Sequence, residues 1–232
     1  MKKFFLSIAA VLVLTATFLS CKEEEEDNTV KLLQSVSEDS SLSSYEYDSQ
    51  NRLTKISRRI GEQFFTETLI YSKYDLFKFG DFNLTPTASN QLTYSDGSIT
   101  YTFDLNSDGT LAKSSYNANG RNYEIKYEYQ NGNLAKITEE GFFDGESLGS
   151  GATEFTYDSM NAPFLNCQTP RWWLIWKFRG HGVTKNNITG ETWDSGGQSG
   201  GSFYSYEYDD EGYPTKRVWN GTEVITHFLY NK

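Results

Sequence analysis

Apolar and polar side chains alternate along several stretches of the chain, most regularly over residues 121–129. Successive side chains of a β-strand point to opposite faces, so this alternation separates an apolar face from a charged one. Residues 64–71 alternate in a similar way. The pattern predicts antiparallel strands with one face on a core and the other in water. Over residues 121–129 the apolar positions are Tyr123, Ile125, Tyr127 and Tyr129, and the polar positions are Asn122, Glu124, Lys126 and Glu128.

One hairpin pattern recurs along the chain, and its clearest copy lies at residues 206–217. Two tyrosines share one face of a predicted strand, Asp209 and Gly212 supply the turn, and Pro214 begins the return strand. Because the copies are unevenly spaced, they form a recurring hairpin and not a solenoid of fixed period. The looser copies begin at Tyr45, Tyr101, Tyr127 and Phe155.

Asn-Gly and Asp-Gly steps mark further turns between the predicted strands. These dipeptides supply the two residues with positive φ that a type I′ turn requires. Gly97, Gly109, Gly120 and Gly132 are 12, 11 and 12 residues apart, and such spacing predicts an antiparallel meander. We therefore expect an all-β domain, an antiparallel meander of about a dozen or more strands that forms a strongly curved sheet or a partly closed β-barrel.

The composition agrees with a folded β domain. Aromatic residues make up 16% and charged residues 22% of the chain, which favours sheets with an apolar face over disorder. Residues 31–232 are of a length that fits a single domain. Two glycine-rich stretches, 141–151 and 195–201, predict long flexible loops of the kind that carry binding sites. The Trp-rich run 172–178 predicts either a buried strand or a short helix, because so short a run has no decisive periodicity.

The N-terminus has a basic start and an apolar run over residues 4–18, too short for a membrane-spanning helix. The tetrapeptide Phe-Leu-Ser-Cys that ends at Cys21 resembles a bacterial lipobox, although Phe18 stands where that motif usually has Leu. The resemblance implies a signal peptide over residues 1–21 and diacylation of Cys21, and two acyl chains would anchor the protein stably. An ordinary secretory signal is the alternative.

An acidic run at residues 22–27 predicts a solvated tether over residues 22–30. Its position after Cys21 resembles the export signal of Bacteroidota surface lipoproteins. This resemblance implies an outer-membrane lipoprotein exposed at the cell surface, and a plain spacer is the alternative. Removal of residues 1–21 would leave 19 basic residues against 31 acidic ones, a net charge of −12. Such a charge argues against nucleic acid or anionic lipid as a partner.

The C-terminal part of the chain resembles a known family. The pattern begins with Asn161-Ala-Pro-Phe164, continues through a hydrophobic stretch to Lys185-Asn-Asn-Ile-Thr189, and closes with the hairpin at residues 206–216. It is similar to a family of Bacteroidota lipoproteins of unknown function with tyrosine-aspartate (YD-like) hairpins, although Ala162 splits what that family more often has as Asn-Pro. The resemblance covers residues 42–230. It implies a porin-like β fold and a surface location, and it implies no catalytic residue.

Aromatic residues are concentrated in the C-terminal third, beside the glycine-rich stretch 195–201. Sugar rings stack on aromatic faces, so exposed rings here would indicate glycan binding. The alternative is that these residues form the core of the β domain, which requires large apolar side chains. The candidate ligand-binding residues are Trp172, Trp193, Tyr204 and Trp219.

Asp104, Asn106 and Asp108 match the opening of a calcium-binding loop. Ser115 stands at the twelfth position, where such a loop has a bidentate Glu, and a hairpin turn explains the same residues. We therefore keep these three only as a weak metal candidate, and we expect no cofactor.

Other chemistry has less support. His181, His227 and Cys167 lack the spacing of a catalytic or metal site, so we interpret them as structural. A glycoside hydrolase requires two carboxylates at a set separation, and an acidic chain offers many pairs. The carboxylates that could supply such a pair are Glu139, Glu140, Asp144, Glu146, Glu191 and Asp194.

The sequence thus predicts a non-catalytic surface lipoprotein that binds a glycan or an envelope or host protein. A transmembrane β-barrel is one alternative, because its strands also alternate; against it, the tyrosines are spread along the apolar face instead of forming two girdles. A carboxylate-dependent glycan hydrolase is another. Exposure of Trp172, Trp193 or Trp219 in a groove would favour glycan binding.

Overall fold

The computed structural model describes residues 30–72, 75–95, 97–221 and 224–231. The predicted signal peptide, Cys21 and the predicted tether up to residue 29 lie outside these residues. The described chain forms 17 strands and one helix, α1 (Arg171–Phe178). The strands are β1 (Leu33–Glu38), β2 (Ser41–Tyr47), β3 (Leu53–Ile60), β4 (Gln63–Tyr71), β5 (Leu76–Phe79), β6 (Phe82–Asn83), β7 (Thr85–Ala88), β8 (Gln91–Ser95), β9 (Thr100–Leu105), β10 (Leu111–Ala118), β11 (Arg121–Gln130), β12 (Asn133–Phe143), β13 (Glu146–Tyr157), β14 (Ile188–Ser195), β15 (Gln198–Tyr208), β16 (Pro214–Asn220) and β17 (Ile225–Tyr230).

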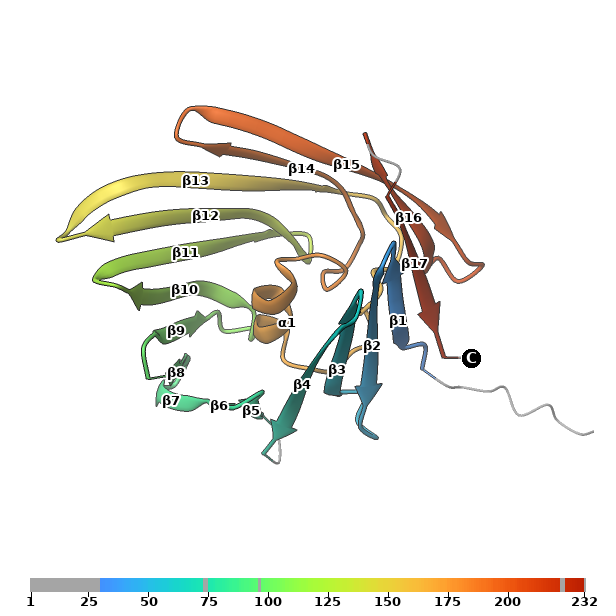
Figure 1. Cartoon of the computed structure of the whole chain (residues 1–232), viewed down its shortest axis with the longest axis horizontal. Helices are drawn as coiled ribbons and strands as arrows, with labels where there is room; N and C mark the ends of the chain where they lie inside the picture. Colours follow the sequence, from blue (N-terminus) through green and yellow to red (C-terminus); the bar gives the residue numbers. More distant parts are fainter. Residues whose placement is uncertain (1–29, 73–74, 96, 222–223, 232) are drawn as a thin grey trace, which may run out of the picture.

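The strands form an antiparallel meander that curves into a nearly closed barrel (Figure 1). Consecutive strands pair along the chain, and β1 pairs with both β2 and β17, which joins the two ends of the meander. Among the described residues no ladder joins β6 to β7, so one seam interrupts the ring. The predicted all-β class and antiparallel meander are confirmed, and the curvature is strong enough to close the barrel everywhere except at this seam.

The hairpin at residues 206–217 has the predicted turn, which Asp209 holds. Its carboxylate accepts hydrogen bonds from two backbone N–H groups that follow it, at 3.1 and 2.9 Å. Asp48 does the same at the β2–β3 turn, at 2.9 and 3.0 Å. An aspartate that hydrogen-bonds the backbone of its own turn fixes the turn conformation, which explains why Asp recurs after the second tyrosine.

Tyrosine hydroxyls tie neighbouring strands together at one end of the barrel. Tyr206 donates a hydrogen bond to the carbonyl oxygen of Ile188, at 2.8 Å, and Tyr71 donates to that of Leu53, at 2.7 Å. In each case a ring near the end of one strand reaches the first residues of the preceding strand. The other pairs of this kind are Tyr47–Leu33, Tyr129–Leu111, Tyr157–Leu134 and Tyr230–Pro214.

Residues 158–187, here called the plug, leave the sheet between β13 and β14 and fill the interior, with α1 inside the ring of strands (Figure 1). The Trp-rich run is thus a helix. A segment inside the barrel cannot join the ladders of the wall, so a helix satisfies its backbone groups internally. The helix starts after Pro170 and ends where Arg179 and Gly180 take φ values of 49° and 88°. Its buried residues are Trp172, Trp173, Leu174 and Ile175.

The two glycine-rich stretches are not loops, so the prediction of long flexible loops is wrong. Residues 141–151 belong to the β12–β13 hairpin and residues 195–201 to the β14–β15 hairpin, and each hairpin has a short turn. At some of these glycines a neighbouring side chain fills the space that a Cβ would need. A Cβ at Gly141, for example, would lie 3.3 Å from the ring of Tyr123.

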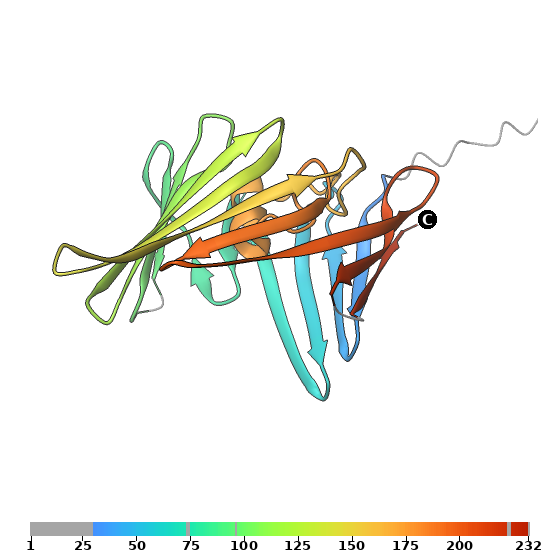
Figure 2. The ribbon, with the colours of Figure 1, turned by 90° about the horizontal axis from the view of Figure 1, so that it is seen from above.

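The plug closes one end of the barrel. The chain enters at this end, where Lys31 Nζ lies 2.8 Å from the carboxylate of Asp209 and the Asn166 side chain donates a hydrogen bond to the carbonyl oxygen of Lys31. The opposite end carries the turns of the β10–β11, β12–β13 and β14–β15 hairpins. There the strands β11–β15 continue past the plug (Figure 2), and their inner face is uncovered.

Candidate functional site

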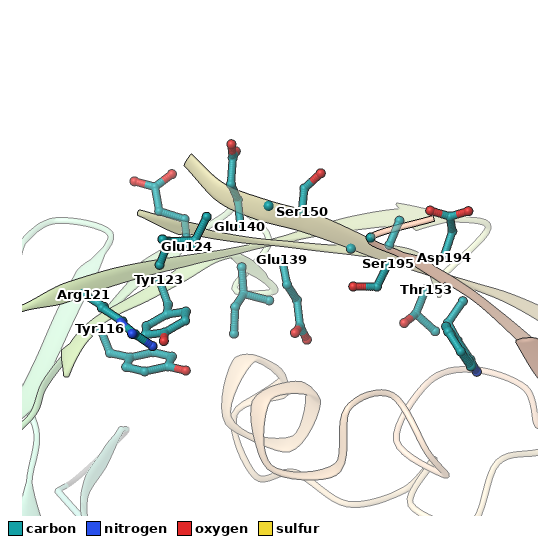
Figure 3. Close-up of a pocket in the computed structure, with 18 of the residues that line it drawn as sticks. Tyr116, Arg121, Tyr123, Glu124, Glu139, Glu140, Ser150, Thr153, Asp194 and Ser195 are labelled. Carbon is teal, nitrogen blue, oxygen red and sulfur yellow. The ribbon is translucent and has the colours of Figure 1, made fainter. Parts of the chain in front are cut away.

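An open groove of about 460 Å³ lies along strands β11–β14 at the unplugged end. Tyr116, Tyr123 and Glu139 point to the inner side, where α1 lies, whereas Glu124 and Glu140 point away from it (Figure 3). This division follows from the alternation of side chains along each strand. The groove therefore has an aromatic inner side, and the outer face of the same strands is acidic.

A row of stacked tyrosines forms one side of the groove. Tyr94, Tyr101, Tyr116 and Tyr123 lie directly opposite one another on β8, β9, β10 and β11. Their ring centroids are 4.7, 5.0 and 4.8 Å apart, with interplanar angles of 15°, 28° and 17°. The row starts at the buried ring of Tyr94 and ends in the groove at Tyr123. Burial raises the pKa of Tyr116, so its hydroxyl stays neutral at physiological pH.

Trp193 forms the other side of the groove, on β14. Its indole is 42% exposed and faces inward, because its register partner Thr153 lies on the inner wall. Gly200 of β15 lies opposite it, and a Cβ there would be 2.6 Å from the indole. The ring thus lies against the backbone of the neighbouring strand, where the glycine gives it room.

An ion pair between the plug and the wall lies at the floor of the groove. The Arg179 guanidinium lies 2.5 Å from the Glu139 carboxylate of β12. Outside the groove, Lys177 pairs with Glu67 of β4 and His181 lies 3.3 Å from Glu191 of β14. Every second residue from Lys177 to His181 therefore contacts a different strand, and together these contacts hold the plug to β4, β12 and β14.

Tyr204 and Trp219 lie outside this groove. The Tyr204 hydroxyl donates a hydrogen bond of 2.9 Å to Glu191, and the Arg217 guanidinium lies 5.2 Å from the centre of the Tyr204 ring. The hydrogen bond with His181, together with that from Tyr204, lowers the pKa of Glu191. Burial raises the pKa of Tyr204 to about 12. Trp219 is the register partner of Tyr204 and is 40% exposed.

Trp172 is part of the core and is therefore no longer a candidate ligand-binding residue. Only 4% of it is exposed, and its ring centroid lies 4.9 Å from that of Phe103 of β9. The sequence grouped it with the other tryptophans, but α1 turns this residue toward the barrel wall. A ring that is covered in this way offers no face to a sugar.

Asp104, Asn106 and Asp108 do not converge on one point. Asp104 accepts a hydrogen bond from Gln91, whereas Asn106 and Asp108 both bond the Thr110 hydroxyl in the β9–β10 turn. The hydrogen bond from Thr110 lowers the pKa of Asp108. Within the described residues no group of three or more His, Cys, Asp or Glu could hold a metal ion. The turn explains this sequence motif.

Sequence reasoning missed most of the groove. It singled out Trp193 and included Glu139 among many carboxylates, but not Tyr116, Tyr123 or Arg179. The tyrosines belong to the alternating pattern that also builds the core, and only strand register decides which of them lie beyond the plug. The arginine pairs with a wall residue 40 positions away, and no local pattern records that contact.

The sequence matches no protein-family model and no curated protein. Two solved structures that match are porin-like proteins. That from Bacteroides vulgatus is 15% identical, with 77% of this chain and 98% of that chain covered and a TM-score of 0.43. That from Bacteroides uniformis is 17% identical, with coverage of 87% and 96% and the same TM-score of 0.43. Within the described residues, no helix is long and apolar enough to span a membrane.

Proposed function

We propose that this protein is a non-catalytic surface lipoprotein of the outer membrane that binds a glycan in the open groove. The observation that carries the proposal is the presence of aromatic rings on both sides of one groove. Trp193 stands on β14 and the stacked pair Tyr116–Tyr123 on β10 and β11, with strands β12 and β13 between them.

This arrangement suits a sugar chain. The apolar faces of pyranose rings pack on aromatic rings, and the hydroxyl groups around their edges require polar partners. Glu139 and Arg179 supply an acceptor and donors at the groove floor. Gly141 and Gly151 line the groove between the rings and have no side chain that would fill it. The groove is open along its length, which suits a polymer better than a small molecule that must be enclosed.

A hydrolase is less well supported by the carboxylates in the barrel. A glycosidase acid must hold a proton near neutral pH, which requires a raised pKa. The pKa of Glu191 is instead lowered by its hydrogen bond with His181, and Glu139 is paired with Arg179. Both carboxylates are suited to holding the plug and not to protonating a leaving group.

A lipid-facing barrel is also less well supported. The outer wall of a transmembrane barrel is apolar, whereas here charged pairs link adjacent strands on the outer face. Lysine and glutamate side chains lie 2.8 Å apart in three such pairs, which would be costly to bury in hydrocarbon. They are Lys55–Glu46, Lys136–Glu154 and Lys216–Glu207.

The anchor and the groove would lie at opposite ends of the molecule. The chain enters the barrel beside the plug, where Lys31 pairs with Asp209, and the groove lies at the other end. A lipid on Cys21, followed by an acidic tether, would therefore hold the plugged end toward the membrane. The groove would then open toward the surroundings of the cell.

The test is binding of soluble polysaccharides to the purified full-length protein, measured by isothermal titration calorimetry across a panel of neutral and acidic polymers. Replacement of a central aromatic contact typically costs more than about 1–2 kcal/mol, so Trp193→Ala should weaken binding by about tenfold or more. Phe203→Ala is the matched control, because Phe203 is exposed but faces outward on β15. Absence of binding to every polymer by the folded wild type would contradict a glycan ligand and favour a protein partner.

A further inference from the structure

The inner wall of the groove carries more cationic than anionic side chains, although the whole chain has a net charge of −10. Arg121, Arg179 and Glu139 line the groove. Glu139 is paired with Arg179. Arg121 has no carboxylate within 4 Å among the residues that the structure describes. Its side chain lies on the same side of the sheet as the rings of Tyr116 and Tyr123 (Figure 3). One guanidinium is thus available at the aromatic side of the groove.

Three further inner-face carboxylates of the barrel are, by contrast, already in ion pairs. Glu38 pairs with Arg217, Glu67 with Lys177, and Glu191 with His181. Arg58 of β3 faces inward opposite Ser43 and, within the described part of the chain, is a second inner-face guanidinium without a carboxylate. Among the described residues that line the groove, the charged inner-face side chain that remains available to a ligand is therefore Arg121.

A guanidinium beside aromatic rings selects a particular kind of sugar. Its planar fork binds a carboxylate or sulfate through two parallel hydrogen bonds, while the adjacent rings stack on the sugar that carries the acid. A densely charged polyanion fits less well, because Glu124, Glu140 and Asp194 carry negative charge on the outer face of the same strands. The groove is matched to a polymer with acidic groups at intervals along an otherwise neutral surface.

We propose that the ligand of this groove is an acidic polysaccharide, and that Arg121 binds its carboxylate or sulfate group. This inference rests on the proposed function, that the groove binds a glycan. Tyr123 and Tyr116 hold the acidic sugar against Arg121, while Trp193 stacks on a neighbouring sugar of the same chain.

The experiment compares each acidic polymer with its own neutral form, using the full-length protein and titration calorimetry. Polygalacturonate, alginate and hyaluronan are compared with the same polymers after reduction of their carboxyl groups, and dextran sulfate is compared with dextran. Hydrogen bonds to a charged group typically contribute enough for about a tenfold difference in affinity. We therefore expect at least one acidic form to bind about tenfold tighter than its neutral form, and the carboxylated and sulfated arms identify which group is recognised.

Arg121→Gln should abolish this preference and leave binding of the neutral form unchanged. Arg59→Gln is the matched control, because Arg59 is exposed on the outer face of β3. Equal binding of acidic and neutral forms, with both lost in Trp193→Ala, would overturn the acidic preference while the proposed glycan binding stands. Absence of binding to every polymer, neutral or acidic, would overturn both. Equal far-UV circular dichroism spectra of the variants ensure that each outcome reports on binding.

Discussion

The indole of Trp193 lies against the backbone of Gly200 on the neighbouring strand, so close that a Cβ at Gly200 would stand 2.6 Å from it. Any side chain at this position must displace the ring. We predict that Gly200→Val moves Trp193 out of its position and weakens glycan binding about as much as Trp193→Ala does. Titration calorimetry measures the affinity, and tryptophan fluorescence reports the displaced ring.

Ser199 provides the control for this substitution. It precedes Gly200 on β15 and faces outward, opposite Asp194. Ser199→Val should leave both the affinity and the fluorescence spectrum unchanged. Unchanged binding by Gly200→Val would show that the position of the Trp193 ring does not matter for the ligand.

Replacing Trp172 and replacing Trp193, which the sequence analysis offered as equivalent candidates, should change different properties of the protein. Trp172 is buried against Phe103, so Trp172→Phe should destabilise the protein by about 1–3 kcal/mol because it leaves unfilled core volume. Its glycan affinity should not change. Trp193→Ala should do the reverse, since Trp193 is exposed. Urea unfolding gives the free energy, and a loss of affinity in folded Trp172→Phe would contradict the assignment of Trp172 to the core.

The tyrosine hydroxyls at the plugged end should contribute measurably to stability. Tyr206→Phe removes the donor to the carbonyl oxygen of Ile188 in a partly buried site, which should lower the free energy of unfolding by about 1–2 kcal/mol. Tyr123→Phe is the control, because no hydrogen bond of its hydroxyl is seen within the described residues. Equal unfolding midpoints for both variants in urea would argue against this role.

The contact between His181 and Glu191 predicts a dependence of stability on pH. The pKa of Glu191 is lowered in the folded protein from its ordinary value of 4.5 by the hydrogen bond with His181. A lowered carboxyl pKa stabilises the fold above the unfolded-state value, and this stabilisation is lost as the pH falls through the folded-state value. Glu191→Gln should therefore be less stable than the wild type at pH 7, by about 1 kcal/mol.

That difference should shrink as the pH falls through the folded-state pKa of Glu191, because the wild-type carboxylate then takes up its proton. Urea unfolding of both proteins at a series of pH values between 7 and 3 provides the measurement. Glu154→Gln serves as the control, because Glu154 forms an exposed pair with Lys136 and such pairs contribute little. A difference between the wild type and Glu191→Gln that stays constant from pH 7 to pH 3 would contradict the role of Glu191.

The sequence predicted the strands of the barrel wall more accurately than the structure of the plug inside it. The alternation over residues 121–129 and the Asp-led turns are local signals, because a strand face and a turn are each set by a few adjacent residues. The helical state of residues 172–178 is not local. It depends on the segment being enclosed by strands that come both before and after it in the chain.

The groove is formed by contacts between residues that lie still farther apart in the sequence. Tyr116 and Tyr123 stack because the β10–β11 register places them opposite each other, and they reach the groove because the plug stops short of them. The glycine-rich stretch 141–151 looked like a loop because its packing partners belong to other strands: Tyr123 of β11 lies beside Gly141 and Ser195 of β14 beside Gly151. Composition alone cannot distinguish a flexible glycine from one that makes room for a neighbour.

The pairing of β1 with β17 has a consequence for how the protein forms. Val36 pairs with Phe228, 192 positions later in the chain, so the ring closes only after the whole barrel has been synthesised. Contacts between such distant positions form slowly. Until then both edges of the sheet are open to pairing with other chains. A chain cut short before β17 should therefore be captured by chaperones or aggregate, and loss of this last strand would act on the yield of the protein before it acted on binding.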